Sequence, residues 1–185
     1  MNLVARVKNL LTRPREEFAV IDREPLSVPD LLTGYVLPLA AIGPIATAIG
    51  WSVFGTGGFV RVSVGYAVSY AIAMFILSIV GVFVAAWVIN MLAPSFGATP
   101  NRHQAIKVSA YSSTAAWVGG IFGIIPFLAP VGVLAGLYSL YLLYVGLPML
   151  MKASPDKAIS YTVVVILTTV LTYIVAGYIA RAVAF

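Results

Sequence analysis

Tyrosines at regular spacing are the residues of this chain best suited to line a functional path. Tyr138, Tyr141 and Tyr144 follow one another at steps of three within an uncharged stretch from 128 to 151. On a helix this spacing makes a slowly drifting stripe, and hydroxyl groups inside a bilayer need hydrogen-bond partners. The stripe therefore predicts either a polar lining or a set of bonds between neighbouring helices.

Four more residues join the stripe as candidates to line a pore or hold a ligand: Tyr35, Pro38, Pro44 and Tyr111. Proline removes a backbone donor and bends or breaks a helix, so a bend is expected near Pro38 or Pro44. The carbonyl groups freed by such a bend can meet either a solute or a tyrosine hydroxyl. One interpretation is a channel or transporter seam for a small neutral or anionic solute. The other is that the tyrosines only hold helices together.

Catalytic groups are scarce. The chain has one histidine and no cysteine, and no Asp or Glu occurs from Leu31 to Pro155. Metal sites and acid–base catalysis need such residues clustered at one point. His103 is expected to be solvated at a helix start, and Ser109, Ser112 and Ser113 have no base beside them, which favours packing and hydrogen bonding between helices. We therefore expect no enzyme, no catalytic residue, no metal and no cofactor.

Small residues mark the candidate helix-packing faces. Gly132 and Gly136 lie four apart in the stretch 128–151, and Gly119 and Gly123 repeat that spacing in the preceding apolar segment. Glycines four apart share one helix face, where another backbone can approach closely. These faces predict an antiparallel hairpin between the two segments or, alternatively, the contact of a homo-oligomer.

Composition places the chain in a membrane. Of its 185 residues, 61% are hydrophobic and 9% are charged, against about 45–50% and about 25% in soluble domains. Apolar runs of about 20 residues can each cross the hydrocarbon core as a helix. The expected fold is an all-α bundle of five transmembrane helices that makes up residues 31–185. The approximate spans are 31–52, 62–92, 105–125, 128–151 and 158–184.

Residues 1–30 are predicted to form short cytoplasmic surface helices. Within 1–12 the apolar residues have helical spacing, and Arg6, Lys8 and Asn9 are expected to turn away from them. A second short helix is expected over 14–24. The first helix could lie in the headgroup region with its cations near anionic lipid, or it could dock on the protein's own cytoplasmic loops.

Basic residues also predict the orientation. With five spans, nine Lys and Arg fall on the side of the amino terminus, and Arg61 and Arg181 fall on the other. The positive-inside rule places the amino terminus in the cytoplasm and the carboxyl terminus outside. The nine are Arg6, Lys8, Arg13, Arg15, Arg23, Arg102, Lys107, Lys152 and Lys157. The net charge of +5 is thus attributed to topology, and no nucleic-acid partner is expected.

Three capping segments agree with this orientation. Residues 27–30, 99–101 and 154–156 each place a hydroxyl and an early proline before an expected span, which is typical of a helix start. Lys107 and Arg181 lie near helix ends, where long side chains reach the interface. Asn90 is the amide well inside an apolar run, and it is expected to bond a neighbouring helix.

Three segments resemble the Yip1 family of five-span membrane proteins in its short prokaryotic form. They are Leu-Leu-Thr-Arg-Pro-Arg-Glu-Glu-Phe at 10–18, Gly-Tyr-Val-Leu-Pro-Leu-Ala-Ala-Ile at 34–42 and Tyr-Ser-Leu-Tyr-Leu-Leu-Tyr-Val-Gly-Leu-Pro-Met-Leu-Met at 138–151. Eukaryotic members have an Asp-Leu-Tyr-Gly-Pro motif and a Gly-Tyr-Ser segment. This sequence has Asp30-Leu31, Gly34-Tyr35 and Pro38 in altered order, and Ala110-Tyr111-Ser112.

The resemblance implies architecture more than activity. Eukaryotic relatives are implicated in vesicle traffic and bind Rab-type GTPases through a longer cytosolic tail. About 30 residues precede the first span here, so that partner is not carried over. The resulting expectation is a non-enzymatic, multi-pass protein of the cell inner (plasma) membrane. Its expected partners are membrane lipids or proteins, or further copies of itself.

Overall fold

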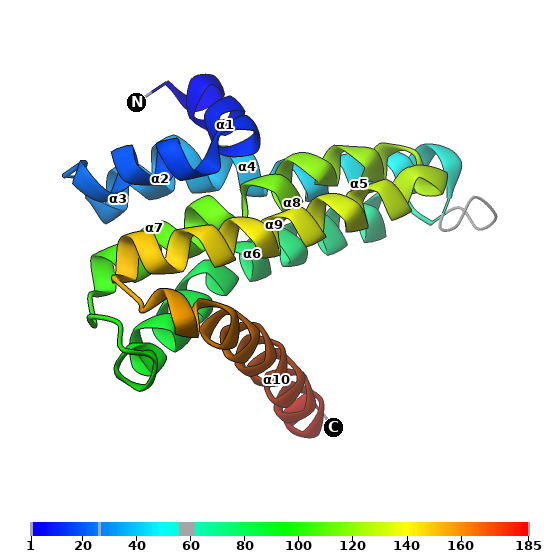
Figure 1. The fold of residues 1–185 in the computed structure, drawn as a ribbon. Coiled ribbons are helices and arrows are strands. Elements are labelled where there is room, and N and C mark those ends of the chain that lie inside the picture. The colour runs from blue at the N-terminus through cyan, green and yellow to red at the C-terminus, as the bar shows by residue number, and fades with distance from the viewer. Residues whose placement is uncertain (1, 26, 56–61, 185) are drawn as a thin grey trace.

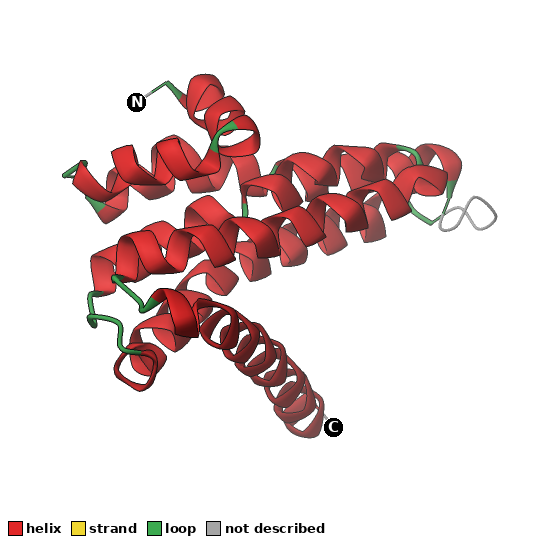
Figure 2. Cartoon of the chain, in the orientation of Figure 1, coloured by secondary structure: helices red, strands yellow, loops and turns green. Residues whose placement is uncertain are grey.

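The computed structural model describes residues 2–25, 27–55 and 62–184. Helices run through almost all of this part of the chain, and it contains no strand (Figures 1 and 2). Two short helices come first, α1 (Leu3–Thr12) and α2 (Pro14–Arg23). They form a hairpin beside one end of the bundle, here named the headpiece (Figure 1). Both surface helices were predicted at these places.

The first long segment is interrupted, as its prolines predicted. It comprises α3 (Val28–Leu31), a π-helical turn (Leu32–Val36), α4 (Leu37–Ala40) and α5 (Ile42–Phe54). Pro44 has no N–H to donate to the carbonyl group of Ala40, and the helix breaks at Ala41 between them.

The remaining helices make a bundle and a diverging arm. α6 (Val64–Leu92) is the longest, and it is followed by α7 (Arg102–Ser112) and α8 (Thr114–Gly119). Two 3₁₀ turns, Gly120–Ile124 and Pro126–Leu128, lead into α9 (Ala129–Met151). α7 and α8 pack along α9, which confirms the predicted hairpin. α10 (Ala158–Ala184) leaves the bundle at a wide angle (Figure 1).

Three segments of the described chain are long and apolar enough to cross a membrane: Val28–Phe54, Val64–Phe96 and Pro126–Met151. The expected third span, 105–125, is divided at Ser113 between α7 and α8 and continues as a 3₁₀ turn. The expected fifth span coincides with α10. The count of five and the side on which each terminus lies stay predictions.

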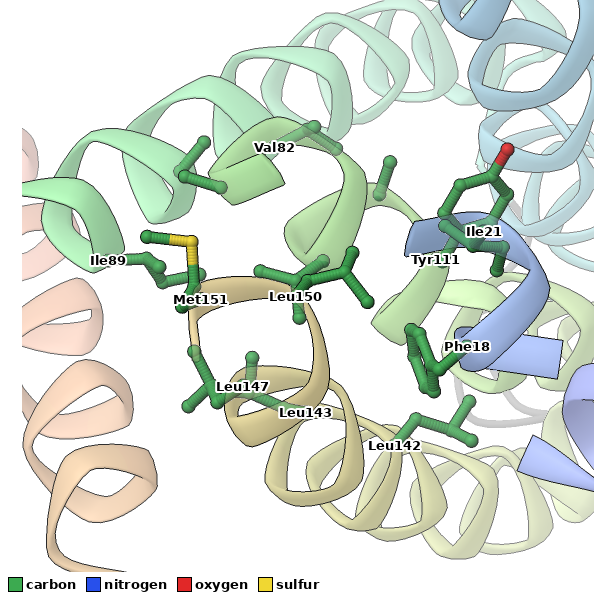
Figure 3. Close-up of a cluster of buried hydrophobic side chains, with 14 of the residues drawn as sticks. Phe18, Ile21, Val82, Ile89, Tyr111, Leu142, Leu143, Leu147, Leu150 and Met151 are labelled. Carbon is green, nitrogen blue, oxygen red and sulfur yellow. The ribbon is translucent and has the colours of Figure 1, made fainter. Parts of the chain in front are cut away.

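The core lies where α9 meets α2 and α7, and α7 in turn packs on α6. Leu142, Leu147 and Leu150 of α9 are fully or almost fully buried. Figure 3 shows the α9 side chains between Val82 and Ile89 of α6 and Phe18 and Ile21 of α2. Burying each such side chain contributes about 1.5–3 kcal/mol where water is the alternative. The headpiece is therefore part of the core and not a separate appendage.

All three predicted capping segments precede helices, but in the described structure only Ser27 caps one with its expected hydroxyl, and at α7 Asn101 caps in place of Thr99. Ser27 is the N-cap of α3 and accepts a hydrogen bond from the Asp30 N–H. The N-cap of α7 is Asn101, whose side chain accepts from the Gln104 N–H at 3.2 Å. Ser154 precedes the 3₁₀ turn Pro155–Lys157 and makes no side-chain cap there. Its segment still marks the start of the last helix.

Candidate functional site

A buried ion-pair network lies inside the headpiece. The guanidinium group of Arg6 donates to Glu17 and to Glu24, each at 2.5 Å. Asn9 donates to the second carboxylate oxygen of Glu17 at 2.9 Å. Burial lowers the pKa of Arg6, but the hydrogen bonds and charge of Glu24, with smaller effects of Tyr111 and Glu17, outweigh burial and raise that pKa above its ordinary value. Arg6 is therefore a permanent cation that holds α1 to α2.

This network corrects one sequence expectation. Arg6, Lys8 and Asn9 were expected to turn away from the apolar residues of their helix; Lys8 and Asn9 are exposed, whereas Arg6 is only 6% exposed. The first helix docks on α2 and α8 of the same chain; its position relative to the headgroup region stays a prediction. Periodicity identifies the apolar face of a helix, but it does not show that a residue beside that face will meet a carboxylate from the next helix.

Contacts from the bundle anchor the headpiece at its α2 end. The ammonium group of Lys107 donates to the carbonyl oxygens of Ile21 at 3.0 Å and Glu24 at 2.7 Å. Asp22 accepts from Gln104 at 2.9 Å and from Lys152 at 2.5 Å. Lys107 was expected to reach the membrane interface, and instead it is buried against the end of α2. The only sequence signal for this anchor is the concentration of carboxylates within 16–30.

Tyr35 and Tyr111 are the two candidate lining residues that the structure brings together deep in the bundle. Both are fully buried. Their rings meet edge to face at 4.7 Å, and the Tyr35 hydroxyl lies 2.7 Å from that of Thr114. The Arg6 guanidinium carbon lies 5.8 Å from the centre of the Tyr111 ring, within the range of a cation–π interaction. The pair links the headpiece network to α7 and α8.

The other three tyrosines do not join this pair. Tyr138 donates to the carbonyl oxygen of Leu11 at the end of α1 at 2.9 Å. Tyr141 is 41% exposed and packs its ring against Tyr138 at 5.4 Å. Tyr144 lines a different hollow, which it shares with Arg15 and Pro148. The three tyrosines of α9 thus have different surroundings, and they do not line one common hollow with Tyr35 and Tyr111.

The two prolines also lie apart from the tyrosines. Pro38 is exposed on α4. Pro44 lines a hollow of about 440 Å³ between α5 and α6, whose other residues, such as Ile45, Ile72 and Phe75, are apolar. The expected role of these seven residues in a path is not tested by this arrangement, and it stays a prediction.

Three of the four candidate packing glycines are used within the chain. A methyl group on Gly119 would lie 2.3 Å from Cβ of Ala135, and one on Gly132 would lie 3.1 Å from the carbonyl oxygen of Gly119. Gly123 faces α5, where a methyl group would lie 2.8 Å from the hydroxyl of Thr47. Gly136 has nothing within 4 Å of that position. Of the four, Gly136 alone has open space for a neighbour.

Of the three serines, Ser109 makes the expected bond between helices: its hydroxyl donates to the Val82 carbonyl oxygen of α6 at 2.9 Å. Ser113 donates instead to the carbonyl oxygen of Ser109, and the Ser112 hydroxyl is buried without a hydrogen-bond partner in the described structure. His103 is exposed in the first turn of α7. Among the described residues, no group of three His, Asp or Glu is placed to hold a metal ion.

Asn90 departs from its expectation. Its amide was predicted to bond a neighbouring helix, yet its side-chain oxygen is buried without a hydrogen-bond partner in the described structure. A buried polar atom without a partner costs about 1–3 kcal/mol.

Comparison with known proteins decides the family. The family model of the Yip1 domain matches residues 8–177, which is nearly the whole chain and includes most of the headpiece. The chain belongs to the Yip1 family. The sequence resemblance is thereby confirmed, and this Yip1-family protein is a membrane protein with transmembrane helices.

A curated relative of this Yip1-family protein is the inner membrane protein YohC of Escherichia coli strain K12. The two are 28% identical over 167 residues, which cover 86% of this chain and 85% of the relative. YohC of Escherichia coli strain O6:H1 matches to the same extent. No solved structure matches this Yip1-family protein.

Proposed function

We propose that this Yip1-family protein is a non-enzymatic, multi-pass protein of the inner membrane that organises anionic lipid at the cytoplasmic leaflet. The inner-membrane location rests on the relative YohC and on the apolar helices. The observation that carries the lipid role is the distribution of charge on the headpiece.

The headpiece buries or partly buries three of its acids, whereas four of its five Lys and Arg residues are exposed. Glu17 is buried, and Asp22 and Glu24 are partly buried in the contacts described above. The exposed charged residues of α1 and α2, together with the residue between them, are Lys8, Arg13, Arg15, Glu16 and Arg23. Four of these five are cations, and each Lys or Arg near an anionic surface contributes about 1 kcal/mol of attraction.

Exposed apolar residues support the same proposal. Val4 is 75% exposed and Val20 is 49% exposed on the headpiece. An amphipathic surface that combines cations with apolar side chains is typical of helices that lie at the headgroup level of a bilayer. Because the headpiece is fixed to the bundle, such a surface holds lipid next to the spans instead of detaching from them.

Lipid enrichment around the protein tests this proposal. The full chain is reconstituted into vesicles that contain a minor fraction of fluorescent phosphatidylglycerol, and energy transfer from a labelled protein reports the local lipid concentration. The variant with Lys8, Arg13, Arg15 and Arg23 all changed to Gln should lose at least tenfold in enrichment, since each of the four cations contributes up to about 1 kcal/mol and a factor of ten corresponds to about 1.4 kcal/mol. The effect should also weaken in high salt.

The matched control keeps the charge. Changing the three arginines among these residues to lysine should leave the enrichment nearly unchanged, because a diffuse surface attraction depends on charge more than on guanidinium geometry. Equal enrichment in the unaltered protein and the Gln variant would exclude the proposed lipid role.

The alternative, a channel or transporter, is not favoured by the positions of its candidate residues. Tyr35 and Tyr111 fill the core, Pro44 lies in an apolar hollow, and Tyr138 bonds the headpiece. The same vesicles should stay tight to small ions and neutral solutes.

A further inference from the structure

A third hollow, separate from the headpiece, lies between α6 and α7. Its volume is about 350 Å³, which is within the usual range for a small-molecule site. The α6 residues that line it recur at the spacing of one helix face, and α7 adds two residues one turn apart. These residues are Phe83, Ala86, Trp87, Asn90, Met91, Arg102 and Ile106.

The hollow is amphipathic. Trp87 is 60% exposed and Met91 is 48% exposed, so the apolar side of the groove opens outward from the bundle. Arg102 is exposed in the first turn of α7, and it makes no hydrogen bond or ion pair with the described residues. No carboxylate lines the hollow. An unpaired cation above an apolar groove is complementary to a phosphate group that carries acyl chains.

Asn90 adds a second, independent requirement. Its side-chain oxygen is the buried acceptor without a partner described above, and Asn90 itself lines the hollow. In the orientation that the structure gives the amide this oxygen is shielded from the hollow, and a half-turn of the amide would bring it to a donor that the ligand supplies. A phosphate group has no donor to offer when it is fully ionised, so the donor must belong to the rest of the headgroup.

From these observations we infer that the α6–α7 hollow binds a single glycerophospholipid whose headgroup carries a hydrogen-bond donor in addition to its phosphate. Arg102 pairs with the phosphate, the Asn90 oxygen accepts from the headgroup donor, and the acyl chains lie along Phe83, Trp87 and Met91. Phosphatidylethanolamine meets this requirement through its ammonium group. Phosphatidylcholine carries the same net charge and has no such donor.

Native mass spectrometry of the full chain, with lipids of identical acyl chains, tests the inference. The unaltered protein should bind one phosphatidylethanolamine about threefold to tenfold more tightly than phosphatidylcholine, the difference that one net hydrogen bond gives. Asn90→Leu should remove this preference. Arg102→Gln should weaken both lipids alike, by about tenfold or more, since a charge-assisted bond is lost.

Binding of phosphatidylglycerol distinguishes the α6–α7 site from the attraction of lipid to the headpiece. The headpiece attraction depends on net charge, so it ranks phosphatidylglycerol above the two neutral lipids and treats those two alike. The α6–α7 site distinguishes between the two neutral lipids, and it should do so equally well in the variant with four headpiece cations changed to Gln. A negative result for lipid enrichment by the headpiece therefore does not affect the test of the α6–α7 site, and the reverse also holds.

Two results would overturn the inference. One is equal binding of phosphatidylethanolamine and phosphatidylcholine by the unaltered protein, which requires no variant at all. The other is a preference that survives Asn90→Leu in a protein that unfolds at the normal temperature. Should Asn90→Leu fail to fold, Asn90→Ala removes the same acceptor without filling the hollow, and Arg102→Gln alters only an exposed side chain.

Discussion

Single side chains hold the headpiece in place. Arg6 meets two carboxylates and faces the ring of Tyr111, so it joins α1, α2 and α7 at one point. Taking charges out of water is costly, and a buried ion pair is stable only while every member keeps its partners. Removing one member of the pair therefore destabilises the fold more than replacing both members with apolar residues does.

Replacing Arg6 with leucine should lower the free energy of unfolding by about 3 kcal/mol, because Glu17 then keeps a buried charge with Asn9 as its one remaining hydrogen-bond partner among the described residues. The measurement is unfolding in mild detergent, followed by circular dichroism.

Arg13→Leu is the matched control for this change. Arg13 lies 3.8 Å from Glu16, and both side chains are more than 70% exposed, so its loss should cost less than about 1 kcal/mol. Equal effects of the two substitutions would show that the Arg6 network contributes no more than a surface pair.

At the scale of elements, close helix contacts depend on particular glycines. α8 approaches α9 where Gly119 faces Ala135 and Gly132, whereas Gly136, one turn further along α9, has nothing within 4 Å of the position of a Cβ atom. The two glycines had equivalent patterns in the sequence, since each belongs to a pair four residues apart. Their surroundings distinguish them, because the drift of a helix face decides which member of a pair meets the neighbouring backbone.

Gly119→Leu should unfold or strongly destabilise the protein, by about 3 kcal/mol or more, since even a Cβ atom there overlaps Ala135 and overpacking of a core costs about 1–3 kcal/mol. Gly136→Leu should leave a folded protein. Thermal unfolding measures the loss of stability in Gly119→Leu, and chromatography in mild detergent shows whether Gly136→Leu remains folded. If Gly136→Leu unfolds the chain while Gly119→Leu does not, the packing of α8 on α9 described above is wrong.

Local sequence patterns predicted where helices begin and break better than they predicted which helices contact one another. The apolar periodicity and Pro14 placed two surface helices at 1–12 and 14–24, and Pro38 and Pro44 placed the break in the first long segment. The contacts that hold the headpiece on the bundle could not be predicted from such patterns. Lys107 meets Ile21 and Glu24 across more than 80 residues, and neither its type nor its spacing distinguishes it from a cation that reaches the interface.

The whole molecule has two distinct ends. The headpiece, the start of α7 and the end of α9 lie together, joined by the contacts of Asp22 with Gln104 and Lys152. This grouping agrees with the predicted placement of the amino terminus and two of the loops on one side. The turn that precedes α9, with Phe127 exposed, leads into the opposite end of that helix.

Cysteine labelling can determine the orientation directly, since the chain has no native cysteine. Asn2→Cys and Lys157→Cys should react with a membrane-impermeant reagent only after the cells are opened, and Phe127→Cys should react in intact cells. Labelling of positions 2 and 127 from the same side would refute the five-span arrangement with its cytoplasmic amino terminus.

The headpiece contacts also set an order of events during synthesis. Leu11 accepts from Tyr138 and Asp22 from Lys152, so these bonds join residues 127 and 130 positions apart. A ribosome adds about 5–20 residues per second, and the first helices therefore wait on the order of ten seconds before their binding partners exist. Until then, Arg6 and its carboxylates remain in water, and the final closure of the molecule follows the insertion of α9.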